Sequence, residues 1–565
     1  MNRLLVAAAT LAVTVAGLAT VSTATASATA SADHRHHRHA YTPPRVHWKP
    51  CRDDFLLEAI GAQCGKVRVP LDYRHPRGRK ISLAVSRLRH TSSRKKYQGI
   101  MLVNPGGPGG SGLILSVLGY PGIIPGRASR TYDWIGFDPR GVGASTPALS
   151  CDRTYFGYDR PRYDPTTPAV LQTWLDRAGG YAKDCANARG SRLLRHVRTV
   201  DTVRDMESIR RALGHRKLNF YGFSYGTYLA QVYATLHPQR VRRFVLDSTV
   251  DPRGIWYRDN FLQDRAFQKN IAVYFGWLAR HDAVFHLGTD PAVIEKQYYD
   301  ELTALEANPA AGGTVGPDEL ADVMLSAGYY VYGWEDVGYA YSAAINADDY
   351  TGIKFMFDGG SPIGSVSDNG YAMYLGTVCT DAHWPRSLDT WRRANEAMAV
   401  EAPFLTWGNA WFNAPCLTWR ARQSTPVHVM GRHVHVPVLM IDETLDGATP
   451  FTGSLEVRRR FRSASLIEGV GGTTHAGSLS GVSCTDKAIG RYLLNGAVPR
   501  RTSGNHSDLQ CPPVPQPDPQ PEPQQPPVPQ TTPSASSTFR NELSPDRRLE
   551  AVRDMIHAVV QDAQP

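Results

Sequence analysis

The sequence predicts an α/β fold with a doubly wound, mostly parallel sheet and an inserted helical lid domain. Three observations lead to this prediction. Short apolar runs alternate with amphipathic segments between residues 99 and 247, a pattern that builds parallel sheets with helices on both faces. The alternation stops after about residue 250 and resumes near residue 436. Within the alternating part, a strand-like run leads through Gly222-Phe-Ser-Tyr-Gly226 into a helical pattern.

The strands expected in the core are short, apolar and bounded by turn residues. The first of them alternates polar and apolar residues, which suits a half-buried edge strand. Amphipathic spacing predicts helices over residues 199–213 and 225–237. The expected strands cover residues 81–86, 99–103, 132–137, 217–221, 241–247, 436–441 and 464–468.

The turn around Ser224 has the features of a nucleophile elbow. Glycines two residues before and after the serine permit a sharp strand-to-helix turn that exposes its hydroxyl. The helix that begins at Tyr225 points its N-terminal N–H groups toward the place where an oxyanion would form. The pattern G-x-S-x-G alone also occurs in ordinary turns with an incidental serine, so the flanking strand and helix support the interpretation.

A second glycine-rich segment, residues 104–112, follows the strand expected at 99–103. Such a segment leaves backbone N–H groups uncrowded. A phosphate loop would need a lysine that is missing here, and a bare turn is the other alternative. Its place after a strand favours an oxyanion loop, and we expect the N–H groups of Gly107 and Tyr225 to form the oxyanion hole.

A serine hydroxyl becomes a good nucleophile when a base accepts its proton and an acid orients that base. The acid is expected in a loop after a late strand, where Asp446 stands. The base is expected about thirty residues later, where His475 lies on a glycine-flanked loop. The acids that compete with Asp446 are Asp247, Asp442 and Glu443, and the histidines that lack the setting of His475 are His433, His435 and His506.

The N-terminal residues predict an exported protein. Residues 1–32 have the charged start, apolar middle and small-residue end of a secretory signal peptide, so we expect a secreted, extracellular enzyme. No other stretch is apolar enough to span a membrane. The net charge of +10 comes from scattered arginines, which favours solubility over nucleic-acid binding. The histidine tract at 34–39 is interpreted as solvated rather than metal-binding, and no cofactor or metal is expected.

The 8 cysteines are an even number, and export favours disulfides over metal ligands. Their spacing favours pairing in sequential order, although other connectivities stay open. The favoured pairs are Cys51 with Cys64, Cys151 with Cys185, Cys379 with Cys416, and Cys484 with Cys511.

Several motifs together are typical of one known family. They are Cys64 with residues 69–73, residues 104–112, 138–143, 222–227, 378–381 and 445–450, His475, and the segment from Cys484 to Cys511. On these motifs, residues 48–511 resemble the secreted tripeptidyl aminopeptidase group of actinomycete α/β-hydrolases, distant relatives of proline iminopeptidase. The resemblance implies an α/β-hydrolase fold with a helical cap, and release of short N-terminal peptides by a serine mechanism through an acyl-enzyme. A threonine precedes His475 where the family usually has glycine, and a secreted esterase or lipase on the same scaffold is the alternative.

An enzyme that requires a free amino terminus needs a carboxylate for the ammonium group. We expect it in the lid, where residues 329–337 combine aromatic side chains with Glu335 and Asp336. The alternative is a helix whose acids face water, and Asp381 is the rival carboxylate.

The domain organisation follows from these segments. A Pro/Gln-rich stretch cannot pack a core, and the amphipathic helix after it has a conjectural cell-wall or protein partner. The expected parts are the signal peptide 1–32, core 33–250, lid 251–432, core 433–511, linker 512–537 and C-terminal helix 538–565.

Overall fold

The computed structural model describes residues 41–158, 160–360 and 364–520, together with Arg553, Ile556 and Ala558. The predicted signal peptide, the histidine tract and most of the linker and C-terminal helix lie outside the described residues. Among the helices that the structure describes, none is long and apolar enough to cross a membrane.

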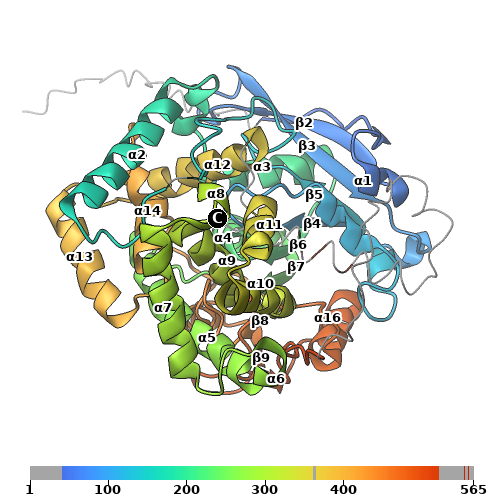
Figure 1. The fold of residues 1–565 in the computed structure, drawn as a ribbon. Coiled ribbons are helices and arrows are strands. Elements are labelled where there is room, and N and C mark those ends of the chain that lie inside the picture. The colour runs from blue at the N-terminus through green and yellow to red at the C-terminus, as the bar shows by residue number, and fades with distance from the viewer. Residues whose placement is uncertain are drawn as a thin grey trace, which may run out of the picture. The chain divides into compact units, whose positions relative to one another are not determined.

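A ten-stranded sheet forms the centre of the described chain (Figure 1). Its strand order is β1-β2-β3-β5-β4-β6-β7-β8-β9-β10. The strands from β5 to β10 pair in parallel, so the prediction of a mostly parallel α/β sheet is confirmed. The strands are β1 (Lys49–Pro50), β2 (Gln63–Pro70), β3 (Lys80–Leu88), β4 (Ile100–Asn104), β5 (Asp133–Phe137), β6 (Leu218–Phe223), β7 (Val241–Asp247), β8 (Val438–Glu443), β9 (Ala464–Gly469) and β10 (Leu509–Cys511).

The strand predicted as an edge strand lies inside the sheet, so that prediction was wrong. Strand β3 pairs antiparallel with β5 on one side and with β2 on the other, from Gln63 opposite Arg87 to Pro70 opposite Lys80. Strand β2 escaped the sequence prediction because Lys66 and Arg68 interrupt its apolar residues. Only Val67 and Val69 show that one face of this strand is buried.

Helices cover both faces of the sheet. In β4, Ile100 and Leu102 join one hydrophobic cluster, whereas Met101 and Val103 join another, because side chains alternate between the faces of a strand. The first cluster includes residues of α3 (Thr199–Ala212), α4 (Tyr225–Leu236) and α15 (Phe451–Arg460), and the second includes α16 (Ser483–Asn495). Helices α3 and α4 thus begin and end within one residue of their predicted bounds. Two further helices are α1 (Phe55–Ala59) and α2 (Pro168–Asn187).

Between β7 and β8 the described residues form helices and add no strand to the sheet. Helices α5, α7, α9 and α10 pack side by side, as Figure 1 shows, around a cluster that buries Trp277 and Trp334. We call residues 251–432 the lid, although these boundaries stay a prediction. The lid helices are α5 (Tyr257–Arg280), α6 (Asp282–Phe285), α7 (Pro291–Ala307), α8 (Ala310–Gly313), α9 (Pro317–Tyr329), α10 (Trp334–Ala347), α11 (Thr351–Gly360), α12 (Ser365–Asp381), α13 (Leu388–Glu401) and α14 (Thr406–Asn413).

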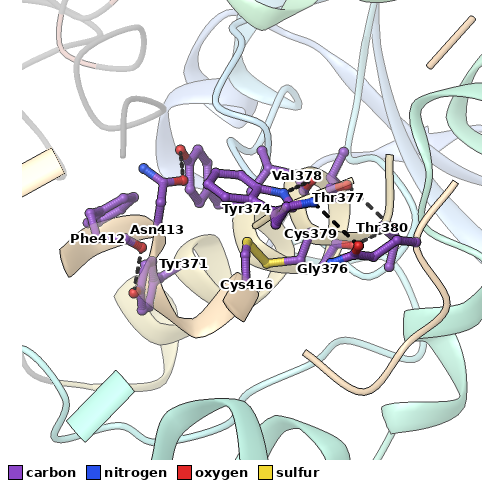
Figure 2. Close-up of a disulfide and its surroundings, with 12 residues drawn as sticks. Tyr371, Tyr374, Gly376, Thr377, Val378, Cys379, Thr380, Phe412, Asn413 and Cys416 are labelled. Atoms are coloured by element: carbon purple, nitrogen blue, oxygen red, sulfur yellow. Dashed lines mark hydrogen bonds between the residues drawn. A yellow bond between two sulfur atoms is a disulfide. The ribbon is translucent and has the colours of Figure 1, made fainter. Parts of the chain in front are cut away.

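The structure joins the cysteines in the four sequential pairs that the spacing favoured. Figure 2 shows the pair Cys379–Cys416, which connects the end of α12 to the segment after α14. Two hydrogen bonds reinforce this connection: the Tyr371 hydroxyl donates to the Phe412 carbonyl, and the Tyr374 hydroxyl donates to Asn413 Oδ1, both at 2.9 Å. Helices α12 and α14 are therefore held together in the C-terminal half of the lid.

A buried ion pair joins the first half of the core. The Arg140 guanidinium donates to both carboxylate oxygens of Asp205, at 2.7 and 2.6 Å, and both side chains are at most 1% exposed. Arg140 also donates to the carbonyls of Leu71 and His196, so β2, the loop after β5, and α3 meet at one cation.

We predict that Arg140→Met lowers the free energy of unfolding by about 3–5 kcal/mol, because it removes the cation that compensates the buried Asp205 charge and leaves only the Tyr73 hydroxyl as a donor to it. Urea denaturation followed by circular dichroism measures this. The control is Arg74→Met, since Arg74 pairs with Asp72 at the surface and the change should leave the midpoint unaltered. Equal midpoints for wild type and the Arg140 variant would contradict the assignment.

We also predict that replacing Cys379 and Cys416 together by alanine destabilises the protein by about 3–4 kcal/mol, because this disulfide closes a loop of 37 residues in the unfolded chain. Thermal unfolding with and without reductant measures the loss. Peptide mapping under non-reducing conditions that joins Cys379 to another cysteine would refute the pairing.

Candidate active site

The backbone at Ser224 adopts a strained turn between β6 and α4. Its φ of 52° and ψ of −126° lie outside the regions that a serine normally occupies. The turn requires glycine nearby, because a Cβ on Gly222 would lie 2.7 Å from the carbonyl carbon of Gly226. The serine is 5% exposed and lines a large cleft. Local sterics thus place this hydroxyl at the cleft, as the sequence pattern predicted.

The glycine-rich loop after β4 packs directly against this turn. A Cβ on Gly106 would lie 2.8 Å from the Ser224 Cβ and 3.3 Å from the Tyr225 backbone nitrogen, so the loop approaches the serine only without a side chain there. Asp138 braces the far end of the loop, where its carboxylate accepts hydrogen bonds from the Ser111 hydroxyl at 2.6 Å and the Gly112 N–H at 3.1 Å. Gly107 and Tyr225, the residues predicted for the oxyanion hole, both line the cleft beside Ser224.

His475 and Asp446 form a fully buried pair. The His475 Nδ1 atom lies 2.8 Å from Asp446 Oδ2 and 3.1 Å from Oδ1, and both side chains have no exposed surface. Asp446 Oδ1 also accepts the backbone N–H groups of Ala448 and Thr449. Burial alone would raise the pKa of Asp446, but His475 and the Thr449 N–H lower it below its ordinary value. The lowered pKa favours the ionised form of Asp446. Its carboxylate contacts the His475 ring at Nδ1, on the opposite side from Nε2.

The competing acids bond elsewhere. Asp442 accepts the Ser454 hydroxyl, Glu443 accepts the backbone N–H of Thr474, and Asp247 accepts that of Ser478. Burial raises the pKa of all three: well above the ordinary value for Asp442, to about 8 for Glu443 and to about 6 for Asp247. Asp446 differs from them because it alone has both a histidine contact and a lowered pKa.

Two further residues, which the sequence did not connect with this pair, hold it in place. The Thr449 hydroxyl donates to Asp446 Oδ2 at 2.9 Å and lies 3.3 Å from His475 Nδ1. From the lid, the Tyr329 carbonyl accepts the backbone N–H of His475 at 2.8 Å, and the Tyr329 ring centroid lies 5.9 Å from the imidazole. Thr449 belongs to the segment 445–450 that carries the family resemblance, but the sequence does not show that its hydroxyl contacts Asp446. The contact of Tyr329 joins positions too far apart in sequence to predict.

The His475 ring has one nitrogen left for chemistry. Its Nε2 atom is buried and makes no hydrogen bond within the part of the chain that the structure describes. Because Nδ1 is engaged by Asp446, this second nitrogen is the one available to exchange a proton with a hydroxyl.

The cleft has a volume of about 2510 Å³, larger than the 300–1,000 Å³ typical of small-molecule sites. Its lining includes aromatic residues of the lid and exposed cations from the N-terminal segment. The aromatic residues include Tyr329, Tyr330, Tyr371, Tyr374 and Phe412, and the cations are Arg45, Lys49, Arg52, Lys66 and Arg68.

The three carboxylates predicted to bind an amine lie in different places. Asp336 is exposed and lines the cleft, whereas the half-buried Glu335 is not among the residues that line it. Asp381 is buried at the end of α12, where it accepts hydrogen bonds from the Thr199 N–H at 2.8 Å and the Thr199 hydroxyl at 2.5 Å. Burial raises the pKa of Asp381 to about 6. Its carboxylate thus caps α3, 182 residues earlier in the chain.

The family assignment comes from whole-chain similarity. Residues 99–337 match the family model described as alpha/beta hydrolase fold, and residues 402–511 match the one described as TAP-like protein. A tripeptidyl aminopeptidase of Streptomyces coelicolor is 38% identical over 479 residues, covering 83% of this chain and 86% of that protein. The chain belongs to the tripeptidyl aminopeptidase family of α/β-hydrolases.

Two other relatives of this chain carry different names. Serine protease Hip1 of Mycobacterium tuberculosis is 31% identical over 478 residues, covering 80% of this chain and 89% of that protein. A protein of the same organism named Carboxylesterase B is 32% identical over 487 residues, covering 83% of this chain and 90% of that protein. The matches to the family models and to the Streptomyces relative confirm the α/β-hydrolase fold and the family resemblance that the motifs predicted.

We predict that Asp446→Asn lowers kcat about 10⁴-fold while the protein stays folded, because the amide can no longer hold His475 in the correct tautomer and charge state. Asp247→Asn is the matched control, since Asp247 is also buried nearby but bonds Ser478. Steady-state kinetics on both purified variants measure the difference. A large loss in the Asp247 variant with little loss in the Asp446 variant would reverse the assignment.

Proposed function

We propose that the protein is a secreted serine exopeptidase that releases short peptides, with tripeptides as the main product, from free N-termini. The observation that carries the proposal is the buried 2.8 Å contact between His475 and Asp446, in a family member whose Ser224 lies at a strained elbow. The Streptomyces relatives are named tripeptidyl aminopeptidase and a mycobacterial relative is named a serine protease, which supports peptide bonds as the substrate.

Each residue of the site then has a role. The Ser224 oxygen attacks the peptide carbonyl carbon, His475 Nε2 accepts the hydroxyl proton, and Asp446 stabilises the resulting imidazolium. The N–H groups of Gly107 and Tyr225 donate to the oxyanion. His475 next protonates the leaving amine, which departs and leaves an acyl-enzyme. A water molecule, deprotonated by His475, hydrolyses the ester and restores Ser224.

An esterase or lipase on the same scaffold is the second candidate, and the relative named Carboxylesterase B favours it. The same serine mechanism cleaves esters, so the triad does not separate the two functions. A requirement for a free amino terminus separates the two functions, because an esterase does not need an amino terminus in its substrate.

Export is supported by the four disulfides, since such bonds persist in oxidising compartments. Together with the signal-like residues 1–32, they form our argument for secretion. A cell-wall or protein partner for residues 538–565 rests on the sequence pattern alone. Within that segment, Ile556 is 4% exposed and belongs to the same hydrophobic cluster as Ile489 and Tyr492, which supports packing on the enzyme itself.

Profiling a peptide library tests the function. Paired peptides with free and acetylated N-termini are incubated with enzyme, and the products are identified by mass spectrometry. We expect tripeptides from the free series and little cleavage of the acetylated series. Hydrolysis of p-nitrophenyl esters without cleavage of either peptide series would select the esterase.

We predict that Ser224→Ala abolishes peptide release, with a loss of kcat on the order of 10⁶-fold, because loss of the nucleophile in such triads removes the covalent pathway. Far-ultraviolet circular dichroism should be unchanged, since the small serine side chain lies at the cleft and contributes little to packing. A variant that retains a tenth of wild-type activity would disprove the role of Ser224.

A further inference from the structure

Ser248 is a buried serine with a strained backbone in the loop directly after β7. Its φ is 60°, in the left-handed region that disfavours residues with a Cβ, and it has no exposed surface. Seven non-glycine residues among those that the structure describes have a positive φ, and three of them, Ser224, Ser248 and Ala476, lie at or beside the triad. Such strain persists where the surroundings impose it, and it is common at active sites.

The sheet places Ser248 between the nucleophile and the acid. In β7 the preceding residue pairs with Phe223 of β6, which comes directly before Ser224. On its other side that residue pairs with Ile441 of β8, the strand that leads to the loop of Asp446. The Ser248 N–H donates to the Ile441 carbonyl at 2.9 Å, which holds the residue in place beyond the end of the strand. Ser248 therefore lies at the carboxyl edge of the sheet, where the catalytic residues meet.

The Ser248 hydroxyl oxygen accepts a hydrogen bond from the loop of the base. The backbone N–H of Ala476, the residue after His475, donates to Ser248 Oγ at 2.7 Å. Ala476 is itself left-handed, with a φ of 55°, so this hydrogen bond joins two residues with unfavourable backbones. A buried N–H needs an acceptor, and Ser248 Oγ provides it. The bond thus holds the backbone directly after His475 in its strained conformation.

The Ser248 hydroxyl proton has two carboxylates nearby. Asp247 Oδ1 lies 3.5 Å from Ser248 Oγ, farther than the roughly 2.5–3.0 Å of a good O–H···O bond. Asp446 is the other carboxylate. Burial alone would raise the pKa of Asp446, His475 lowers it, and a hydrogen bond from Ser248 lowers it further. One hydroxyl thus accepts from the loop of the base and donates to the acid.

We propose that Ser248 is a positioning residue for the triad. Its hydroxyl ties the loop that follows His475 to Asp446 and thereby holds the imidazole Nδ1 against the carboxylate. Ser248 is not among the residues that line the cleft, so it acts through His475 rather than on the substrate. The inference rests on the serine mechanism of the proposed function and applies equally to peptide and ester substrates. A glycine at this position would relieve the strain but would bond neither the loop nor the acid.

The test compares Ser248→Gly and Ser248→Ala with wild type. Both variants lack the hydroxyl, but glycine adopts a φ of 60° without strain, whereas alanine keeps the strain. We expect kcat to fall about 10–100-fold in both variants, with KM within about 2-fold, because the lost hydroxyl affects proton transfer and not substrate binding. The melting temperature should be lower for the alanine variant than for the glycine variant, so the loss of activity would not follow stability.

Two substrates separate the steps of the reaction. A tripeptidyl-anilide with a free N-terminus reports on peptide release. With p-nitrophenyl acetate, stopped-flow absorbance measures the acylation burst and the slower deacylation separately. His475 acts as the base in both half-reactions, so both rates should fall by a similar factor in the two variants.

Ser465→Ala is the matched control. Ser465 is also a fully buried serine, and its hydroxyl donates to the Pro499 carbonyl at 2.8 Å, but it lies at the amino end of β9. Its kcat should stay within about 2-fold of wild type. Wild-type kcat in Ser248→Gly would overturn the proposal. A loss of kcat in the alanine variant alone would mean that Ser248 supports only stability and would overturn it too. Full activity of Ser224→Ala would instead contradict the serine mechanism itself, and the inference with it.

Discussion

The strained backbone at Ser224 is the constraint on which the rest of the site depends. A left-handed φ at serine costs about 1–3 kcal/mol and persists only where the surroundings over-determine it. Here β6 is paired on both sides, and the Ser224 N–H donates to the Asp247 carbonyl at 3.0 Å. The glycines at 106 and 222 remove the side chains that would collide with the turn. The sheet thus stabilises an unfavourable conformation that places Ser224 at the cleft.

Besides lining the cleft, the lid contacts the two loops that carry Asp446 and His475. The Asn270 amide of α5 donates to the carbonyls of Leu445 and Thr473, one residue before Asp446 and two before His475. Tyr329, at the end of α9, accepts the N–H of His475. Helix α5 thus contacts both the loop of Asp446 and the loop of His475, whereas α9 contacts the loop of His475.

Carboxylates that lie close together in the sequence differ in pKa because their surroundings differ. Asp442 and Asp446 lie four residues apart and both are buried, yet the pKa of Asp442 is raised and that of Asp446 is lowered. The difference comes from the contact with His475 and from the N–H groups around Asp446, because hydrogen bonds to a carboxylate favour its ionised form.

The sequence by itself determined the mostly parallel sheet and the strand–turn–helix around Ser224, and its cysteine spacing favoured the disulfide pairs that the structure joins. These features depend on local properties, namely the period of apolar residues, the steric freedom of glycine and the spacing of cysteines. Only the tertiary structure decided that β3 lies inside the sheet, that Asp381 caps α3, and that Ser248 bonds the loop of His475. These features depend on contacts between segments that are far apart in the sequence. Such contacts, rather than the neighbouring residues in the chain, decide whether a carboxylate is buried and which donors bond it.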